Sequence, residues 1–267
     1  MQTKIEGILI RKIPYQDRHI IGTLLLRSGR KVSVLFYGGQ GGGKKLKSST
    51  LELGHMLRVE LGRSKSTSDL YRAKEWSPIW IHEKIRFDYK AFCTMCLMLE
   101  IIDHMSTDDD LHDDLTSSED SMIGLFRVLS NGLVHLEARV SAKSFDRYSE
   151  LIIYLGKLLI EQGVFPERSS CVFCDQELKN ASLIYLVTDH GGFGCSECVG
   201  HLEDALLSSA QEGRELWEIL GVVANEKYQN LVELKLEHTE ITKTLLAYFF
   251  YQFHMEPKQL KGLSSVI

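Results

Sequence analysis

The chain has 267 residues, 44% of them hydrophobic and 25% charged, which is ordinary for a globular protein of one large domain or a few small ones. The first residues lack a continuous apolar stretch, and the longest apolar runs, such as Leu245–Tyr251, fall far short of the ~18 residues that span a bilayer. These features exclude a secretory signal and a membrane-spanning helix, so we expect a cytoplasmic protein. Six cysteines in that compartment indicate metal binding or free thiols rather than a disulfide scaffold.

The net charge of −5 conceals an asymmetry along the chain. Residues 1–78 carry 15 Lys/Arg against 6 Asp/Glu, a net charge of +9, whereas the remainder carries 16 against 30, a net charge of −14. This asymmetry indicates that the N-terminal part meets a polyanion and that the rest does not. A basic face without a partner is the alternative.

The first 76 residues have the pattern of a small β-structure. Five short runs of strand-forming or alternating residues are separated by turn signals at Ser28-Gly29, at the glycine-rich stretch after Tyr37, and at 62–64. The runs are Ile5–Arg11, Ile20–Leu26, Lys31–Tyr37, Gly54–Leu61 and Ser68–Glu75. Five short antiparallel strands in so few residues favour a closed barrel, and the OB-fold is the natural candidate.

From His82 onward the apolar spacing becomes helical. Tyr89–Met105 is apolar almost all round, which predicts a buried helix, and an acidic connector follows at Asp103–Asp120. Four further segments are expected to be helical: Ser121–Glu137, Phe145–Gln162, Glu203–Leu220 and Glu226–Phe253. We therefore predict an α+β fold with an OB-fold domain at 1–80 and a helical domain at 81–267, the latter interrupted by an insert at 168–200.

The stretch Tyr37–Ser49, YGGQGGGKKLKSS, has the spacing G-x-x-x-x-G-K of a phosphate-binding P-loop. Lys45 occupies the position of the Mg²⁺-ligating hydroxyl, and an alternating strand pattern follows where a P-loop requires a helix. A nucleotidase remains the alternative to a flexible cationic loop that contacts the phosphates of a nucleic acid backbone.

Basic residues elsewhere in the same domain support the nucleic-acid interpretation, and four aromatics, Phe36, Tyr37, Tyr71 and Trp76, are candidates for stacking single-stranded bases. Phe36 and Tyr37 are neighbours in a strand, so only one of them can face inward. The predicted DNA contacts are Arg11, Lys12, Arg18, Arg27, Arg30, Lys31, Lys44, Lys45, Lys47, Arg63, Lys65, Arg72 and Lys74.

Two C-x2-C pairs, Cys171–Cys174 and Cys195–Cys198, stand 20 residues apart. This spacing is typical of two knuckles that complete a tetrahedral four-cysteine zinc site. Because four thiolates leave no open position on the metal, we predict one structural Zn²⁺ in a ribbon-like element. A third pair, Cys93 and Cys96, falls in the buried helix and is interpreted as core packing. No known catalytic motif is present, so we predict no catalytic residues and a binding protein.

The order of these parts resembles the RecO family of bacterial DNA repair proteins. GILIRKIPYQDRHIIGTLLLRSGRKVSVLFYGG is similar to the family opening, with Tyr15 and Asp17 ahead of the second strand and a turn at Gly29. GGGKKLKSS falls where the family has a basic loop, and LLAYFFYQFHMEPKQLKGLSSV resembles the closing helix and tail. Some family members lack the four cysteines, so the resemblance implies that zinc is not needed for the core activity.

The resemblance implies a non-enzymatic recombination mediator in the cytoplasm of a bacterium, associated with the nucleoid. Such a protein binds single- and double-stranded DNA, anneals complementary strands, and partners RecR and the single-stranded-DNA-binding protein to help load RecA. Two other hypotheses stay open, namely the P-loop-like nucleotidase and a zinc-ribbon and OB-fold protein that binds RNA.

Overall fold

The computed structural model describes residues 4–39, 50–62, 70–108, 124–201, 210–231 and 239–267. By their contacts the residues form two compact units, 1–142 and 143–267. No helix in these described ranges is long and apolar enough to cross a membrane.

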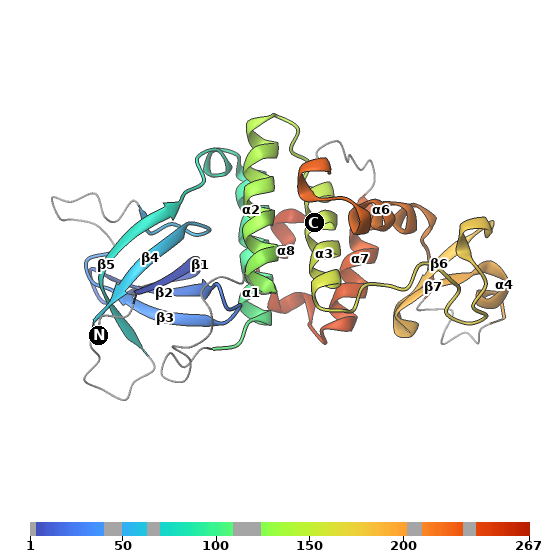
Figure 1. Cartoon of the computed structure of the whole chain (residues 1–267), viewed down its shortest axis with the longest axis horizontal. Coiled ribbons are helices and arrows are strands. Elements are labelled where there is room, and N and C mark those ends of the chain that lie inside the picture. Colours follow the sequence, from blue (N-terminus) through green and yellow to red (C-terminus); the bar gives the residue numbers. More distant parts are fainter. Residues whose placement is uncertain (1–3, 40–49, 63–69, 109–123, 202–209, 232–238) are drawn as a thin grey trace. The chain divides into compact units, whose positions relative to one another are not determined.

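The first unit begins with a closed five-stranded barrel (Figure 1). Its strand order is β1-β2-β3-β5-β4, in which β3 and β5 are parallel and all other pairs are antiparallel. The strands are β1 (Lys4–Tyr15), β2 (His19–Leu26), β3 (Lys31–Phe36), β4 (Met56–Leu61) and β5 (Tyr71–Trp80). The predicted OB-fold barrel is therefore confirmed.

Alternating side chains of the strands fill the barrel. Leu9, Leu24, Val34 and Phe36 are among the buried residues of this core and are completely inaccessible to solvent. Gly22 is required where β2 crosses the core, because a Cβ atom there would lie 2.8 Å from side-chain atoms of both Leu9 and Phe36. The barrel interior is thus a packed core, and ligands must bind on its outside.

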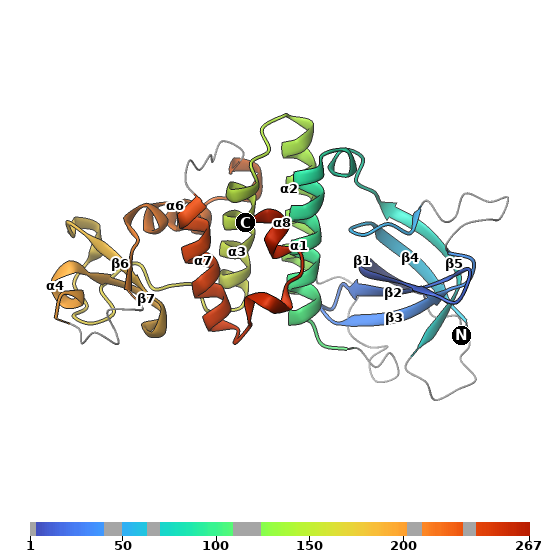
Figure 2. The same ribbon diagram turned by 180° about the vertical axis from the view of Figure 1, so that it is seen from behind.

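Two helices complete the first unit, namely α1 (Tyr89–Met105) and α2 (Leu125–Ser141), preceded by the 3₁₀ turn η2 (Ile85–Phe87). They lie side by side in both Figure 1 and Figure 2. The bounds of α1 match the prediction because Asp88 caps the helix, its carboxylate accepting from the backbone N–H of Ala91 at 3.0 Å. Helix α2 continues past the predicted end at Glu137 as far as Ser141.

The second unit combines helices with a small three-stranded sheet of order β7-β6-β8. Helix α3 packs against α6 and α7, and a Cβ atom on Gly156 of α3 would lie 2.8 Å from Val223 of α6. The longer elements are α3 (Arg147–Glu161), α6 (Arg214–Asn225) and α7 (Thr239–Gln252), and the strands are β6 (Ile184–Val187), β7 (Gly192–Cys195) and β8 (Ala210–Glu212). The short helices are η3 (Leu178–Asn180), η4 (Thr188–His190), α4 (Ser196–Val199), η5 (Tyr228–Asn230), η6 (Pro257–Gln259) and α8 (Leu263–Val266).

The predicted helix Glu203–Leu220 is wrong over part of its length. Residues 210–212 form strand β8 on β6, and helix α6 begins only at Arg214. Gly213 separates the two, its N–H donating to the carbonyl of Ile184 at 2.8 Å. The sheet partner is remote in sequence, so helical periodicity alone did not show where the helix begins.

The described part of the segment Glu226–Phe253 is helical from Thr239 to Gln252, with η5 before it, and residues 232–238 lie outside the described residues.

Strand β5 ends at Trp80, which coincides with the end of the predicted domain 1–80. By their contacts α1 and α2 nevertheless group with the barrel. The domain ranges 1–80, 81–267 and 168–200 stay predictions.

Candidate nucleic-acid interface and metal centre

An exposed aromatic cluster lies on the outside of the barrel where β2 begins and β3 ends. Tyr37 directly follows β3 and is 45% exposed. Its ring meets that of His19 edge-on, with centroids 4.7 Å apart, and the guanidinium of Arg72 lies 6.0 Å from its centroid. The Nδ1 atom of His19 accepts from the backbone N–H of Gly38 at 3.1 Å, which holds the imidazole beside the strand end.

This cluster borders the turn between β1 and β2 and the start of β5. OB-fold barrels bind oligonucleotides on the face of strands 2 and 3, between the β1–β2 and β4–β5 loops. Arg18 in the first turn is exposed, and so are Arg72 and Lys74 near the start of β5. The cluster therefore offers a ring for stacking and cations for phosphates at the expected place.

The other aromatic candidates lie inward. Phe36 is fully buried, and Trp76 packs against it edge-on with centroids 5.3 Å apart, while Tyr71 is partly buried against the same core. The alternation expected for Phe36 and Tyr37 is confirmed, with Phe36 inside and Tyr37 outside. Tyr37 is thus the one residue of the four whose ring is open for stacking.

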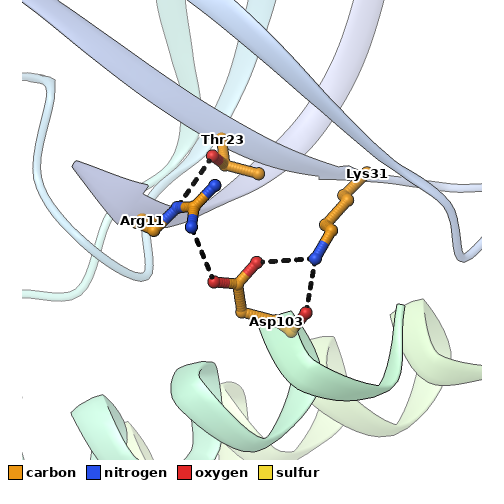
Figure 3. A network of polar contacts seen from close by, with 4 residues as sticks. All are labelled: Arg11, Thr23, Lys31 and Asp103. Atoms are coloured by element: carbon orange, nitrogen blue, oxygen red, sulfur yellow. Dashed lines mark hydrogen bonds and ion pairs between the residues drawn. The ribbon is translucent and has the colours of Figure 1, made fainter. Parts of the chain in front are cut away.

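Two of the predicted DNA contacts, Arg11 and Lys31, bind the same aspartate (Figure 3). The Nζ atom of Lys31 lies 3.0 Å from one carboxylate oxygen of Asp103 and also donates to its backbone carbonyl, while Arg11 Nη1 lies 3.6 Å from the other oxygen. Arg11 also donates from Nε to Thr23 Oγ1 at 3.3 Å. Asp103, where the predicted helix and the predicted acidic connector overlap, lies in the last turn of α1 and links that helix to β1 and β3.

Two further predicted contacts, Arg27 and Lys12, have acidic partners in the first unit. Arg27 binds Glu6 at 3.0 Å, and Arg58 binds the other oxygen of the same carboxylate at 2.7 Å. Burial raises the pKa of Glu6, but hydrogen bonds from Arg58 and Arg27 outweigh it and hold that pKa below its ordinary value. Lys12 donates to the carbonyl of Leu51 at 2.6 Å and lies 3.6 Å from a carboxylate oxygen of Glu52.

The remaining predicted contacts divide into two groups. Four are exposed on the barrel: Arg18, Arg30, Arg72 and Lys74. Five lie outside the described residues: Lys44, Lys45, Lys47, Arg63 and Lys65. The lysines of the apparent P-loop therefore stay a prediction, although the chain after this segment continues into strand β4 rather than a long helix.

Sequence reasoning did not single out His19 and Tyr15 as members of this surface. They pair across the β1–β2 hairpin, and Tyr15 is 40% exposed. Their position next to the first turn of an OB-fold is the signal that could have identified them.

The four cysteines Cys171, Cys174, Cys195 and Cys198 come together in the second unit. Their sulfur atoms all lie within 4.8 Å of one another, and no other such group of His, Cys, Asp and Glu occurs among the residues the structure describes. The Sγ atoms of Cys174 and Cys195 are 3.9 Å apart. Tetrahedral coordination with metal–sulfur bonds of ~2.3 Å requires about 3.8 Å between sulfurs, so the donor set and its spacing fit a metal ion.

Local backbone bonds shape the two cysteine turns. Cys171 and Cys174 flank a turn in which Asp175 N–H donates to the Cys171 carbonyl at 3.0 Å, while Cys195 ends β7 and Cys198 lies in α4. Cys195 N–H donates to the Cys171 sulfur at 3.3 Å. Burial raises the pKa of the Cys171 thiol, but this bond and two others from its own turn lower it to about 7. These bonds favour a thiolate, the form that binds metal, at Cys171, whereas the pKa of Cys198 is raised by burial and by the neighbouring thiols.

The Cys171 turn is attached to helix α6 through Arg168. Its guanidinium stacks 4.6 Å from the ring centroid of Trp217, whose Nε1 donates to the Arg168 carbonyl at 2.7 Å. A Cβ atom at Gly221 would collide with the same guanidinium, so a larger residue there would displace the end of the Arg168 side chain. This stack holds the backbone just before the cysteine element, the segment 171–198 that carries the four cysteines, in place against α6.

Cys93 and Cys96 lie on α1 as predicted, each half-buried. Burial, with Cys93 and Glu100 nearby, raises the pKa of the Cys96 thiol to about 11. A thiol with so high a pKa stays protonated at neutral pH, which fits a packing role rather than metal binding or redox chemistry.

No protein-family model matches the chain. Three curated relatives share the name "DNA repair protein RecO". The relative from Moorella thermoacetica is 25% identical over 219 residues, 80% of this chain and 73% of its own length. The relative from an Exiguobacterium species is 22% identical over 86% of this chain and 83% of its own length.

The third relative, from Chloroherpeton thalassium, is 26% identical over 266 residues, which cover 96% of this chain and 94% of the relative. This third match is long enough to include the barrel, the helices and the four cysteines together. The resemblance predicted from the sequence is confirmed, because the chain is similar along 80–96% of its length to three proteins named DNA repair protein RecO.

Proposed function

We propose that this protein is a DNA-binding mediator of recombinational DNA repair and acts by binding rather than by catalysis. The observation that carries the proposal is the cluster of Tyr37, His19 and Arg72 at the ligand-binding face of an OB-fold barrel. The name shared by the three relatives supports the repair role.

In this proposal a single strand crosses the barrel between the β1–β2 turn and the start of β5. A base stacks on Tyr37, and Arg72, Lys74 and Arg18 neutralise phosphates, as do the predicted lysines at 44, 45 and 47. None of these contacts reads a base edge, so binding is independent of sequence and weakens steeply with salt. A mediator that must release DNA benefits from such a surface.

Further partners follow from the resemblance rather than from a contact in the structure. We propose that the protein also binds duplex DNA, anneals complementary strands, and acts with RecR and the single-stranded-DNA-binding protein in loading RecA. The net charge of −14 over residues 79–267 favours protein partners for most of that part, because DNA is repelled from an acidic surface, whereas residues 84–90 hold three cations against one acid.

We also propose that the four cysteines hold one structural Zn²⁺. The ion would join the Cys171 turn to the end of β7 and the start of α4, and would contribute folding free energy to this small element. Four thiolates saturate the metal, so it takes no part in DNA chemistry.

The test is a salt titration of binding to single-stranded DNA with Tyr37→Ser, Arg72→Glu and a triple charge reversal of Lys44, Lys45 and Lys47. Each is expected to weaken binding, and the charge changes are expected to flatten the salt dependence. Tyr251→Ser serves as a control, because Tyr251 is similarly exposed, at 50%, on α7 of the second unit. Wild-type protein that ignores DNA at low salt contradicts the proposal.

Two measurements address the remaining alternatives. ATP hydrolysis that disappears in Lys44→Ala supports the nucleotidase. Competition between DNA and RNA strands of one sequence shows whether the barrel prefers RNA.

A further inference from the structure

The most exposed large aromatic residues of the described chain lie away from the Tyr37 cluster. Phe87 is 82% exposed and Tyr89 is 75% exposed, at the junction of η2 and α1. Exposed cations flank them, namely Lys84, Arg86 and Lys90, and Asp88 stands between the two aromatics. The guanidinium of Arg86 lies 5.7 Å from the Phe87 ring centroid, yet most of the ring surface remains open to solvent.

The turn that carries these aromatics is firmly anchored. The carboxylate of Glu137 on α2 accepts from three consecutive backbone N–H groups, those of Glu83 and Lys84 at 2.8 Å and that of Ile85 at 3.0 Å. The Ile85 side chain is fully buried. On the other side of Phe87, Asp88 caps helix α1. The two rings are therefore exposed on a preorganised backbone, which reduces the entropy lost when a ligand binds.

This surface is separate from the Tyr37 cluster. Arg72 lies near the start of β5 and Trp80 at its end, and eight residues of strand span at most about 26 Å, less the shortening at two irregularities of β5. Phe87 and Tyr89 follow seven and nine residues after Trp80. One strand of DNA would have to run along the barrel to contact both places.

We propose that Phe87 and Tyr89, with Lys84, Arg86 and Lys90, form a second platform for single-stranded DNA. The cores of protein–protein interfaces are depleted in lysine, whereas aromatic side chains flanked by cations are typical of surfaces that stack bases and neutralise phosphates. This inference rests on the proposed function, because it requires that the protein bind single strands at all. A second platform explains how one chain holds a long strand while its barrel releases part of it.

The test separates stacking from phosphate binding by comparing two strands of about 30 nucleotides, longer than the ~16-nucleotide upper limit for one OB-fold. One strand carries bases and the other is abasic. Phe87→Ser/Tyr89→Ser should weaken binding of the base-bearing strand by about five- to a hundredfold for each lost stack and leave binding of the abasic strand unchanged. Phe87→Trp should retain or strengthen binding. Because both side chains are exposed, thermal melting of the variants should match that of wild type.

Equal affinity of the double variant and wild type for the base-bearing strand overturns the inference, and so does an equal loss on both strands. Tyr37→Ser, measured in parallel, keeps the two proposals apart. If Tyr37→Ser weakens binding while Phe87→Ser/Tyr89→Ser does not, only the second platform fails. If wild-type protein binds neither strand, the proposed function fails with it.

Discussion

Lys31 on β3 donates to both the carboxylate and the backbone carbonyl of Asp103, so this lysine attaches the C-terminal end of α1 to the barrel. The exposed fractions of the two side chains are only 16% and 17%, which strengthens the pair relative to a surface salt bridge. Arg11 adds a second cation to the same carboxylate. The aspartate therefore occupies the position that a phosphate would take between these two cations.

Asp103→Asn tests this arrangement. Loss of the charge should lower the free energy of unfolding by about 1–3 kcal/mol, between the values for exposed and for buried pairs. It should also strengthen binding of single-stranded DNA, because Arg11 and Lys31 become available to phosphates. The dependence of log K on log salt should steepen by about 0.7 for each cation that joins the DNA. Unchanged salt dependence would show that neither cation reaches DNA.

The cysteine element provides a prediction on metal content. Purified protein should contain one zinc per chain, measured by elemental analysis, and Cys171→Ser should lose it and melt at a lower temperature. The matched control is Cys96→Ser, which removes a thiol of α1 and should keep the zinc. Full zinc content in Cys171→Ser would place the ion elsewhere.

The anchored turn before α1 provides a third prediction. Glu137→Ala removes the acceptor of three backbone N–H groups and should lower the stability of the first unit by about 1–3 kcal/mol. Glu137→Gln keeps an acceptor oxygen and should lose less. Urea unfolding of the three proteins measures the difference. A Glu137→Ala variant as stable as wild type would show that the turn holds without the carboxylate.

Two buried histidines predict a pH dependence of stability. His55 and His82 meet edge-on with centroids 4.7 Å apart, each bound to a backbone carbonyl, that of Thr50 and that of Leu53. Burial, with the charge of His82 and Arg86 nearby, lowers the pKa of His55 despite the Thr50 carbonyl and Glu52. Its folded-state pKa then lies below the unfolded value of about 6.5, so the unfolded chain binds more protons in acid.

Stability from His55 is therefore fully present above pH ~6.5 and decreases as the pH falls below that value. Urea unfolding at several pH values measures the effect. His55→Asn serves as the control, since its amide can donate to the Thr50 carbonyl but does not titrate, and it should show a weaker dependence. Equal pH dependence of the two proteins contradicts the assignment to His55.

Much of this architecture could be predicted because local signals agree with the fold. The bounds of α1 follow from Asp88 as a cap and from a continuous apolar pattern, and the cysteine quartet follows from its spacing. Strand β5 was predicted to end near Glu75, but it continues to Trp80 because Pro78 pairs with Leu57 on β4. In the sequence alone, Pro78 indicates the end of a strand, because proline cannot donate a hydrogen bond to a neighbouring strand.

The candidate site was less predictable because a list of basic residues carries no information on pairing. Arg11, Lys12, Arg27 and Lys31 have acidic partners that lie between 21 and 92 positions away in sequence, and only the fold brings these together. Which face of a strand a lysine or arginine side chain lies on, and which acidic residue of a neighbouring strand it meets there, depends on how the strands pair. That Phe36 and Tyr37 face opposite ways could be predicted, because alternation is local, but only the fold shows that Tyr37 is the one outside.

The order of strands in the barrel has a consequence for its biogenesis. Of the five barrel strands, β5 is synthesised last, but it lies between β3 and β4 in the barrel. Both of these strands therefore keep an unpaired edge until β5 is in place. A nascent or truncated chain that ends before Tyr71 exposes two sheet edges and is expected to aggregate. Since β5 also carries Arg72 and Lys74, the strand that removes this hazard brings the last part of the DNA surface with it. A chain in which the barrel is still open therefore cannot display a complete DNA surface.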